Sequence, residues 1–181
     1  MSTYTRREFL CGTAACCAMP ATLVPTVVAA SPTATRKMTI SLSPGSIGVS
    51  ADQREAIALA SRHGFEAVEP YGEFLAGLSD AQTQELLADL QARKLTWGAA
   101  GLPVEFRRDD ARFETGLKEL PRVATGCQRA GVTRVGTWLM PCHASLTYTA
   151  NFQRHAARLR EAAKILKDHG HRLGLEYVGT P

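Results

Sequence analysis

The chain has 181 residues, which is enough for one domain, and 45% of them are hydrophobic, as in soluble globular proteins. Its formal net charge of +4 is mildly basic, but no basic run is interleaved with aromatic residues. This composition argues against nucleic acid as a partner.

Residues 1–30 are predicted to be an export signal rather than part of the fold. Arg6 and Arg7, in the run TRREFL, resemble the twin-arginine export motif, and the stretch 11–30 that follows is uncharged. Two prolines interrupt this stretch, so it is too short and too broken to form a stable membrane span. Small residues before Ser31 predict cleavage at that point. We therefore expect a periplasmic or secreted protein, with no membrane association after cleavage.

Cysteine usage also changes at the predicted cleavage point. Cys11, Cys16 and Cys17 leave with the signal, and the mature chain keeps Cys127 and Cys142. Two thiols make no disulfide framework, although an oxidising compartment leaves a single disulfide open. The sequence has no paired-cysteine zinc motif. A lipid anchor on Cys16 also stays open, although the residues before it match a lipoprotein box poorly.

The mature chain begins with a Pro/Thr-rich linker at residues 31–37 and then alternates strand patterns with helix patterns. Strands are predicted at residues 38–43, 65–69, 95–100, 132–138 and 172–177. The helices between them begin at two predicted capping boxes, at Ser50 and Ser79, and then cover residues 110–130 and 152–170. Pro121 lies inside the third helical pattern, and we expect it to kink that helix or to start a new one.

The same order of elements recurs along the chain. A helix end, a glycine and a short strand follow one another at Gly64, Gly131 and Gly170. This repetition predicts parallel strands that are joined by crossover helices. Parallel strands place ligand sites at their carboxyl ends. The last predicted strand ends on Glu176 and Tyr177, so a carboxylate is expected at that edge.

Two architectures agree with four strand–helix units and a fifth strand. One is a little over half of a TIM (β/α)8 barrel, which needs about 250 residues when complete. The other is an open doubly wound sheet, but the loop at residues 44–48 is not a clean dinucleotide fingerprint. On the last strand Leu173 and Leu175 alternate with Gly174 and Glu176, whereas strands buried in open sheets are more continuously aliphatic. The sequence therefore predicts an α/β fold, a partial TIM barrel over residues 38–181.

The run VGTW at residues 135–138 followed by His143, together with the run RLGLEY at residues 172–177, resembles a known family. This is the xylose isomerase-like family of sugar phosphate isomerases and epimerases, and the resemblance covers its N-terminal part. It implies a TIM barrel that binds a divalent metal (Mn, Mg, Zn or Co) at the ends of its later strands. It further implies that Glu176 is the first metal ligand. The other ligands would come from strands six to eight, so we do not expect this chain to retain the metal.

The resemblance also implies a catalytic role for Glu176 besides metal binding. Moving a proton next to a carbonyl needs a base and a group that holds the developing enediolate oxygen. A carboxylate at the metal edge can act as that base. The residues alone leave another interpretation open, in which Glu176 is an exposed strand-end carboxylate without a role.

Further candidates for substrate binding lie in the loops after the strands. His143 follows the fourth strand, Trp138 ends it, and Glu69 and Tyr71 follow the second strand. His143 and Trp138 can instead be a surface histidine and a packed aromatic residue, and Glu69 can be a structural partner. The remaining histidines are expected on helix surfaces or caps, without chemistry: His63, His155, His169 and His171.

The leading hypothesis is an exported, metal-dependent sugar isomerase or epimerase, of which this chain is an incomplete piece that is inactive by itself. Its partner would be a small carbohydrate. One alternative is a lyase or hydrolase of the same fold that acts on oxidised glycosides. Another is a non-catalytic half-barrel that binds sugars. Without strands six to eight, the first and last strands would be uncovered edges, so a homo-oligomer is also expected.

Overall fold

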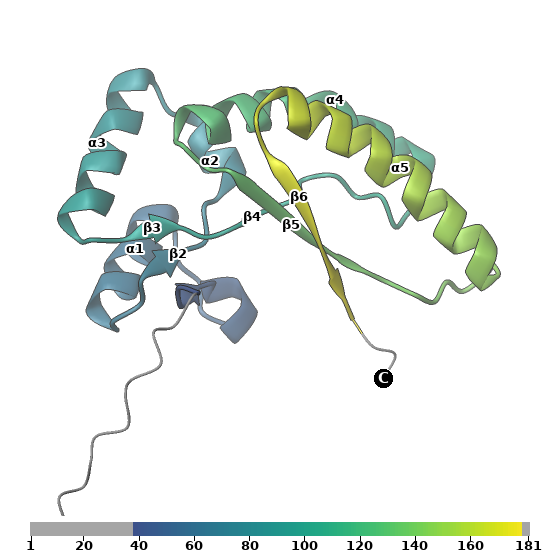
Figure 1. Ribbon diagram of the computed structural model, residues 1–181, viewed down its shortest axis with the longest axis horizontal. Helices are drawn as coiled ribbons and strands as arrows, with labels where there is room; N and C mark the ends of the chain where they lie inside the picture. The colour runs from purple at the N-terminus through teal and green to yellow at the C-terminus, as the bar shows by residue number, and fades with distance from the viewer. Residues whose placement is uncertain (1–37, 179–181) are drawn as a thin grey trace, which may run out of the picture. The chain divides into compact units, whose positions relative to one another are not determined.

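The computed structural model describes residues 38–178, which belong to one structural unit (Figure 1). The twin-arginine motif, the predicted cleavage site and the linker at residues 31–37 lie outside the described residues. Export, signal cleavage and a lipid anchor on Cys16 therefore stay predictions. Among residues 38–178, no helix has the length and apolar character needed to cross a membrane.

Six strands form two parallel sheets of three, with the order β1–β2–β3 in one and β4–β5–β6 in the other. The strands are β1 (Ser41–Leu42), β2 (Ala67–Val68), β3 (Thr96–Trp97), β4 (Ala100–Gly101), β5 (Arg134–Leu139) and β6 (Arg172–Tyr177). Neighbours in each sheet are also consecutive in the chain, as in the wall of a (β/α) barrel. The predicted partial TIM barrel is confirmed, and the described strands do not close into a ring.

Helices cross over between these strands, with a short 3-10 helix after β1. They are η1 (Pro44–Ile47), α1 (Gln53–Arg62), α2 (Gly72–Gly77), α3 (Asp80–Ala92), α4 (Asp110–Arg129) and α5 (Tyr148–Asp168). Three left-handed glycines follow α1, α4 and α5, at Gly64, Gly131 and Gly170, where the sequence predicted helix ends. Figure 1 shows α4 and α5 side by side along the sheet that contains β5 and β6.

The predicted third strand is split into β3 and β4, which belong to different sheets. The Gly98 amide still bonds to the Val68 carbonyl of β2, whereas the Leu102 amide bonds to the Gly136 carbonyl of β5. A Cβ on Gly98 would lie 2.5 Å from the Ser41 hydroxyl, so a larger residue there would require the Ser41 side chain to turn away. The segment therefore changes neighbour along its length, which is how staggered strands build the wall of a barrel.

One of the two predicted capping boxes is displaced. The box of α1 is formed by Asp52 and Glu55, whose side chains bond each other's backbone amides at 2.8 and 2.9 Å. Ser50 lies before this turn, so the prediction of a box at Ser50 is wrong by two residues. The box of α3 is formed by Ser79 and Gln82, as predicted.

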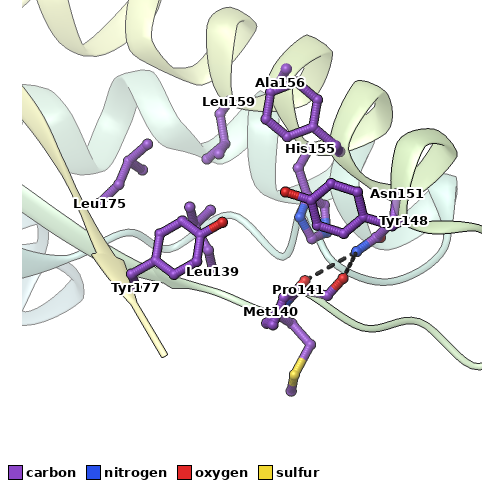
Figure 2. A pocket seen from close by; sticks show the side chains of 11 residues that line it. Leu139, Met140, Pro141, Tyr148, Asn151, His155, Ala156, Leu159, Leu175 and Tyr177 are labelled. Atoms are coloured by element: carbon purple, nitrogen blue, oxygen red, sulfur yellow. Dashed lines mark hydrogen bonds between the residues drawn. The ribbon is translucent and has the colours of Figure 1, made fainter. Parts of the chain in front are cut away.

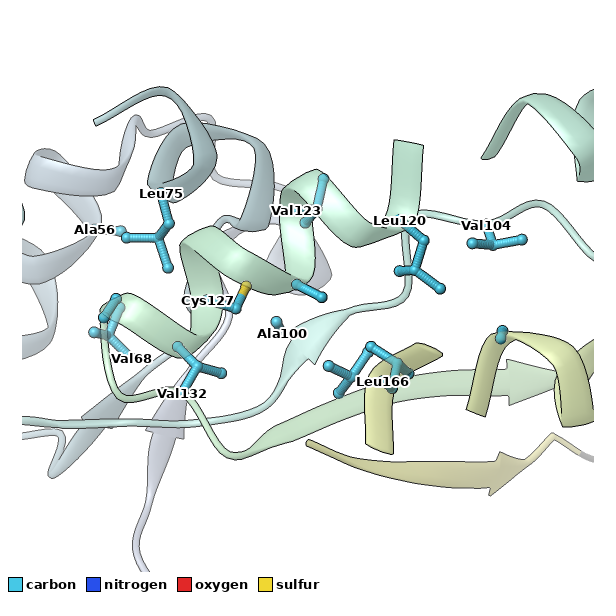
Figure 3. Packing of buried hydrophobic residues seen from close by; sticks show 14 of the residues in the cluster. Ala56, Val68, Leu75, Ala100, Val104, Leu120, Val123, Cys127, Val132 and Leu166 are labelled. Atoms are coloured by element: carbon cyan, nitrogen blue, oxygen red, sulfur yellow. The ribbon is translucent and has the colours of Figure 1, made fainter. Parts of the chain in front are cut away.

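Pro121 lies inside α4, which is a single helix from Asp110 to Arg129, so the predicted restart at Pro121 is wrong. Close packing against α2 supports α4 beyond the proline. A Cβ on Gly126 would lie 2.5 Å from the Ala76 Cα of α2. Figure 3 shows Leu75 of α2 directed toward α4, near Cys127. Helix α2 was not predicted from the sequence, because six residues are too few to show a helical period.

The buried core lies between the sheets and the helices, and it includes a histidine that was expected on the surface. His171 is 5% exposed, and its Nε2 lies 2.9 Å from the Ala124 carbonyl oxygen of α4. The expectation of a surface or cap position is therefore wrong for His171. Burial also raises the pKa of the Cys127 thiol to about 11, and both Cys127 and Cys142 are free thiols.

Candidate functional site

A hollow of about 500 Å³ lies at the carboxyl ends of the strands, where barrel proteins bind ligands. We call it the strand-end hollow. Its lining comes from both sheets: Ser41, Ser43, Glu69, Ala99, Ala100, Gly101, Gly136, Thr137, Trp138, Gly174, Leu175 and Glu176. Gly101, Gly136 and Gly174, on β4, β5 and β6, leave space on this face of the sheet. The hollow is therefore the inner side of the partial barrel.

Glu176 lies on this inner face, near the end of β6. It is paired in register with Trp138 of β5, two residues after the pair of Gly136 and Gly174. Side chains two residues apart point to the same face of a strand. The Glu176 carboxylate is exposed and makes no hydrogen bond or ion pair with any residue in 38–178. It is available to a ligand in the strand-end hollow.

Glu69 lines the same hollow, but its carboxylate already has a hydrogen-bond partner. Its carboxylate accepts a hydrogen bond from the Ser43 hydroxyl, which lies 2.9 Å from the Ser46 hydroxyl. The backbone carbonyl of Glu69 accepts a bond of 3.1 Å from Gln53, a fully buried side chain of α1. Sequence reasoning missed Gln53, because its polar side chain gave no sign of burial. The structure brings the two predicted carboxylates, Glu69 and Glu176, to one hollow.

Tyr71 lies elsewhere. It precedes α2, its amide donates a 2.5 Å bond to Gln53, and its side chain packs against the core. Burial raises the pKa of the Tyr71 phenol, and the charges of Glu69 and Asp52 raise it further. Tyr71 does not line the strand-end hollow. Its position suits a structural role beside Glu69.

A second hollow of about 670 Å³ adjoins the first, and Trp138 lines both. We call it the arginine hollow. Its walls are the loop before α4, the loop after β5 and the first turns of α5. His143 lies here, half-buried, with its Nδ1 accepting a 3.1 Å bond from the Ser145 amide. His143 and Glu176 therefore line different hollows.

Arg107 lies in the arginine hollow against Trp138, which lines both hollows, and no motif in the sequence marks Arg107 as a site residue. Its guanidinium donates to the Thr137 hydroxyl at 2.7 Å and to the Trp138 carbonyl at 2.8 Å. The guanidinium carbon lies 3.9 Å from the centre of the Trp138 ring and 4.3 Å from that of Phe106. One face of Trp138 is thus covered by a cation. A sugar that stacks on this residue must use the other face.

Helix α5 fixes the backbone of the loop that carries Arg107. Arg154 donates to the Arg107 carbonyl at 2.8 Å, and Arg158 donates to the Phe106 carbonyl at 2.9 Å. His155 packs edge-on against Phe106 and is only 7% exposed, so the expectation that it lies on a helix surface is wrong. Burial lowers the pKa of His155, and the nearby arginine charges lower it further.

A smaller apolar groove of about 230 Å³ lies on the other face of β6, toward α5 (Figure 2). Leu175 and Tyr177 line it from the strand, and Phe152 and Tyr148 line it from the helix. The neighbouring phenol of Tyr177 raises the pKa of Tyr148. The predicted alternation on this strand is therefore confirmed, with bulky residues toward the helix and Glu176 toward the barrel interior.

The described residues do not make a complete metal site. Among residues 38–178, no group of three or more His, Cys, Asp and Glu side chains is placed to hold an ion. Glu176 offers one free carboxylate, whereas divalent ions take several oxygen or nitrogen ligands. The residues present therefore fit a divalent metal only as a part of its ligand set.

Parallel strands in chain order with a hollow at their carboxyl ends define the (β/α) barrel class. Residues 57–181 match the model of the xylose isomerase-like TIM barrel, and the chain belongs to this family. No match was found among curated proteins.

Solved structures agree with this assignment. A xylose isomerase domain protein from Alicyclobacillus acidocaldarius is 27% identical, with a TM-score of 0.58 over 72% of this chain and 47% of that one. IolI protein with a zinc atom has a TM-score of 0.62 at 18% identity, over 78% and 52%. D-psicose 3-epimerase from Clostridium cellulolyticum H10 has 0.54 at 19%, over 70% and 47%. The chain thus spans about half the length of these proteins.

Proposed function

We propose that this chain supplies the N-terminal half of the active site of a metal-dependent sugar isomerase or epimerase. The observation that carries the proposal is the unpaired Glu176 carboxylate in the strand-end hollow, beside Trp138. Membership of the xylose isomerase-like family supports the same reaction class. Similar folds that are named as epimerases add support at the level of the fold alone.

In this proposal Glu176 is the base. Its carboxylate takes the proton from the carbon next to the substrate carbonyl and leaves an enediolate. Delivery of the proton to the former carbonyl carbon, with the hydroxyl proton passing to the former carbonyl oxygen, gives an isomer. An epimer forms when the same carbon receives a proton on its opposite face, which needs a second acid from outside the described residues. The Ser43 hydroxyl and the Glu69 carboxylate lie in the same hollow and would bond sugar hydroxyls. The open face of Trp138 would pack against the sugar.

A divalent metal would supply the Lewis acid that polarises the carbonyl. Since Glu176 is a single ligand, the other ligands would come from polypeptide that completes the barrel, and the described residues support no step through the metal. Export by the twin-arginine route and a periplasmic location belong to the same proposal. They rest on Arg6 and Arg7.

The proposal is tested by following solvent deuterium exchange next to the carbonyl of a panel of ketoses, by NMR. The protein for this test carries the further strands that the proposal requires, and it is supplied with Mn²⁺. We expect exchange with the right substrate, at least 100-fold slower in Glu176→Gln, because the base is lost. The matched control is Glu161→Gln on the exposed side of α5, which should exchange at the normal rate.

Two outcomes would contradict this function. One is exchange that survives Glu176→Gln unchanged. The other is cleavage of a glycoside into two fragments, which would assign the protein to the lyase or hydrolase alternative. Product analysis on the same samples separates a rearranged sugar from two fragments.

A further inference from the structure

The arginine hollow has more positively charged side chains than negatively charged ones in its lining. Its charged lining consists of four arginines and two acids: Arg107, Arg108, Arg112, Arg154, Glu105 and Asp109. Counting these gives 4 − 2 = +2, with His143 and His155 taken as neutral. Glu105 pairs with Arg107 at 3.2 Å, and Asp109 pairs with Arg112 at 3.6 Å. Arg108 and Arg154 therefore have no carboxylate partner within residues 38–178.

The wall formed by α5 also holds polar atoms without partners. The Nε atom of Arg154 is enclosed and has no hydrogen bond, although its terminal nitrogen reaches the Arg107 carbonyl. The same holds for the Nε2 atom of His155 and for the side-chain oxygen of Asn151, and these two side chains are more than nine-tenths buried. Leaving buried polar groups unpaired destabilises a fold. Such a wall is better suited to a polar ligand than to packing.

We propose that the arginine hollow binds an oxyanion carried by the substrate, so that the enzyme acts on acidic sugars rather than neutral ones. Guanidinium groups bind carboxylates and phosphates through paired hydrogen bonds, which makes a free arginine in a hollow well suited to them. Trp138 lines both hollows, so one sugar can reach Glu176 while its acidic group lies near Arg108 and Arg154. The choice of reaction in this inference rests on the proposed function, whereas the anion site does not.

The test measures binding of three probes to the full chain by calorimetry at low salt. D-glucuronate carries a carboxylate, D-glucose 6-phosphate carries a phosphate, and D-glucose carries neither. We expect at least one acidic sugar to bind about tenfold more tightly than glucose, with an advantage that shrinks as salt screens the charges. Comparison of the two acidic sugars tells which oxyanion the hollow prefers.

Arg108→Gln is the decisive variant, because the Arg108 side chain is exposed and makes no contact that holds the fold. We expect it to weaken the acidic sugar about tenfold and to leave glucose unchanged. Arg160→Gln is the matched control, since this exposed arginine of α5 does not line the hollow. Equal binding of all three sugars, an unaffected Arg108→Gln, or an equal loss in Arg160→Gln would overturn the inference.

Glu176→Gln separates this inference from the proposed function. The variant should keep the acidic-sugar affinity, because the oxyanion site does not include Glu176. If acidic sugars bind but never exchange deuterium in the complete protein, the reaction is wrong and the anion site stands. If neutral ketoses exchange and acidic sugars do not bind, the reaction stands and the anion site is wrong.

Discussion

Trp138 and Glu176 lie side by side on neighbouring strands, as register partners of β5 and β6. The Arg107 guanidinium covers one face of the Trp138 ring. A ligand that stacks on the other face does not need to displace Arg107. The proposed base and the boundary between the two hollows therefore lie on adjacent strands. In the proposed function, the reacting carbon of the substrate would lie beside this pair.

Metal affinity tests whether Glu176 stands alone in this chain. Since one carboxylate cannot hold a hydrated divalent ion tightly, we expect negligible specific binding of Mn²⁺ or Zn²⁺ to the 181-residue chain. Titration calorimetry gives the answer. A stoichiometric micromolar site that disappears in Glu176→Gln would show that further ligands are already present.

Acid should destabilise the fold partly through His155. Because burial and nearby arginines lower its pKa in the folded state, the unfolded chain takes up the proton first, at its ordinary pKa of 6.5. This contribution to the free energy of unfolding is therefore complete well above pH 6.5 and is lost as pH falls from that value through the lowered pKa of the folded state. His155→Phe, which keeps a ring against Phe106, should flatten the pH dependence of the urea midpoint between pH 7.5 and pH 5.5.

His63→Gln is the control for that experiment, because His63 is exposed at the end of α1. Its pH dependence should follow the parent chain. An equally steep fall of the midpoint in His155→Phe would show that other groups carry the acid response.

The contact between α2 and α4 should tolerate no side chain at Gly126. A Cβ there would lie 2.5 Å from the Ala76 Cα and 2.6 Å from its nitrogen, and backbone cannot move aside cheaply. We expect Gly126→Ala to lower the free energy of unfolding by about 1–3 kcal/mol, as overpacking does. Gly77→Ala is the matched control, because nothing lies within 4 Å of the added methyl group. Equal stabilities in urea would mean that the two helices are not packed this closely.

The open edge of β6 should drive self-association. Within the described residues this strand has a partner on one side only. Two of its own residues, Leu175 and Tyr177, are 54% and 73% exposed. Uncovered edges recruit other chains. Residues 31–181 should therefore elute as an oligomer in size-exclusion chromatography, and Leu175→Lys should shift the profile toward monomer. Arg160→Glu, on exposed α5 surface, should not change it.

A monodisperse monomer with a sharp two-state melting transition would contradict that expectation. It would mean that residues 31–181 form a complete small domain. Self-association through β6 would then have no role in the stability of the protein.

The parts of the fold that sequence reasoning predicted depend on local patterns. The alternation of Leu173, Gly174, Leu175 and Glu176 placed the carboxylate on the inner face correctly, because side chains alternate along any strand. Arg107, His155 and Gln53 were missed or misplaced, because their contacts are with residues far away in the chain. A single sequence gives no signal for such pairings.

The three bonds from Arg154 and Arg158 to the carbonyls of Phe106, Arg107 and Arg108 have a mechanical consequence. They hold the loop before α4 against α5, the helix that follows β5 in the chain. The loop and the first half of α5 must therefore move together, because movement of either one alone would leave the guanidinium groups of Arg154 and Arg158 without these hydrogen-bond partners. On this side, the rim of the barrel is therefore rigid rather than a movable loop. Any movement that admits a ligand would have to come from another part of the rim.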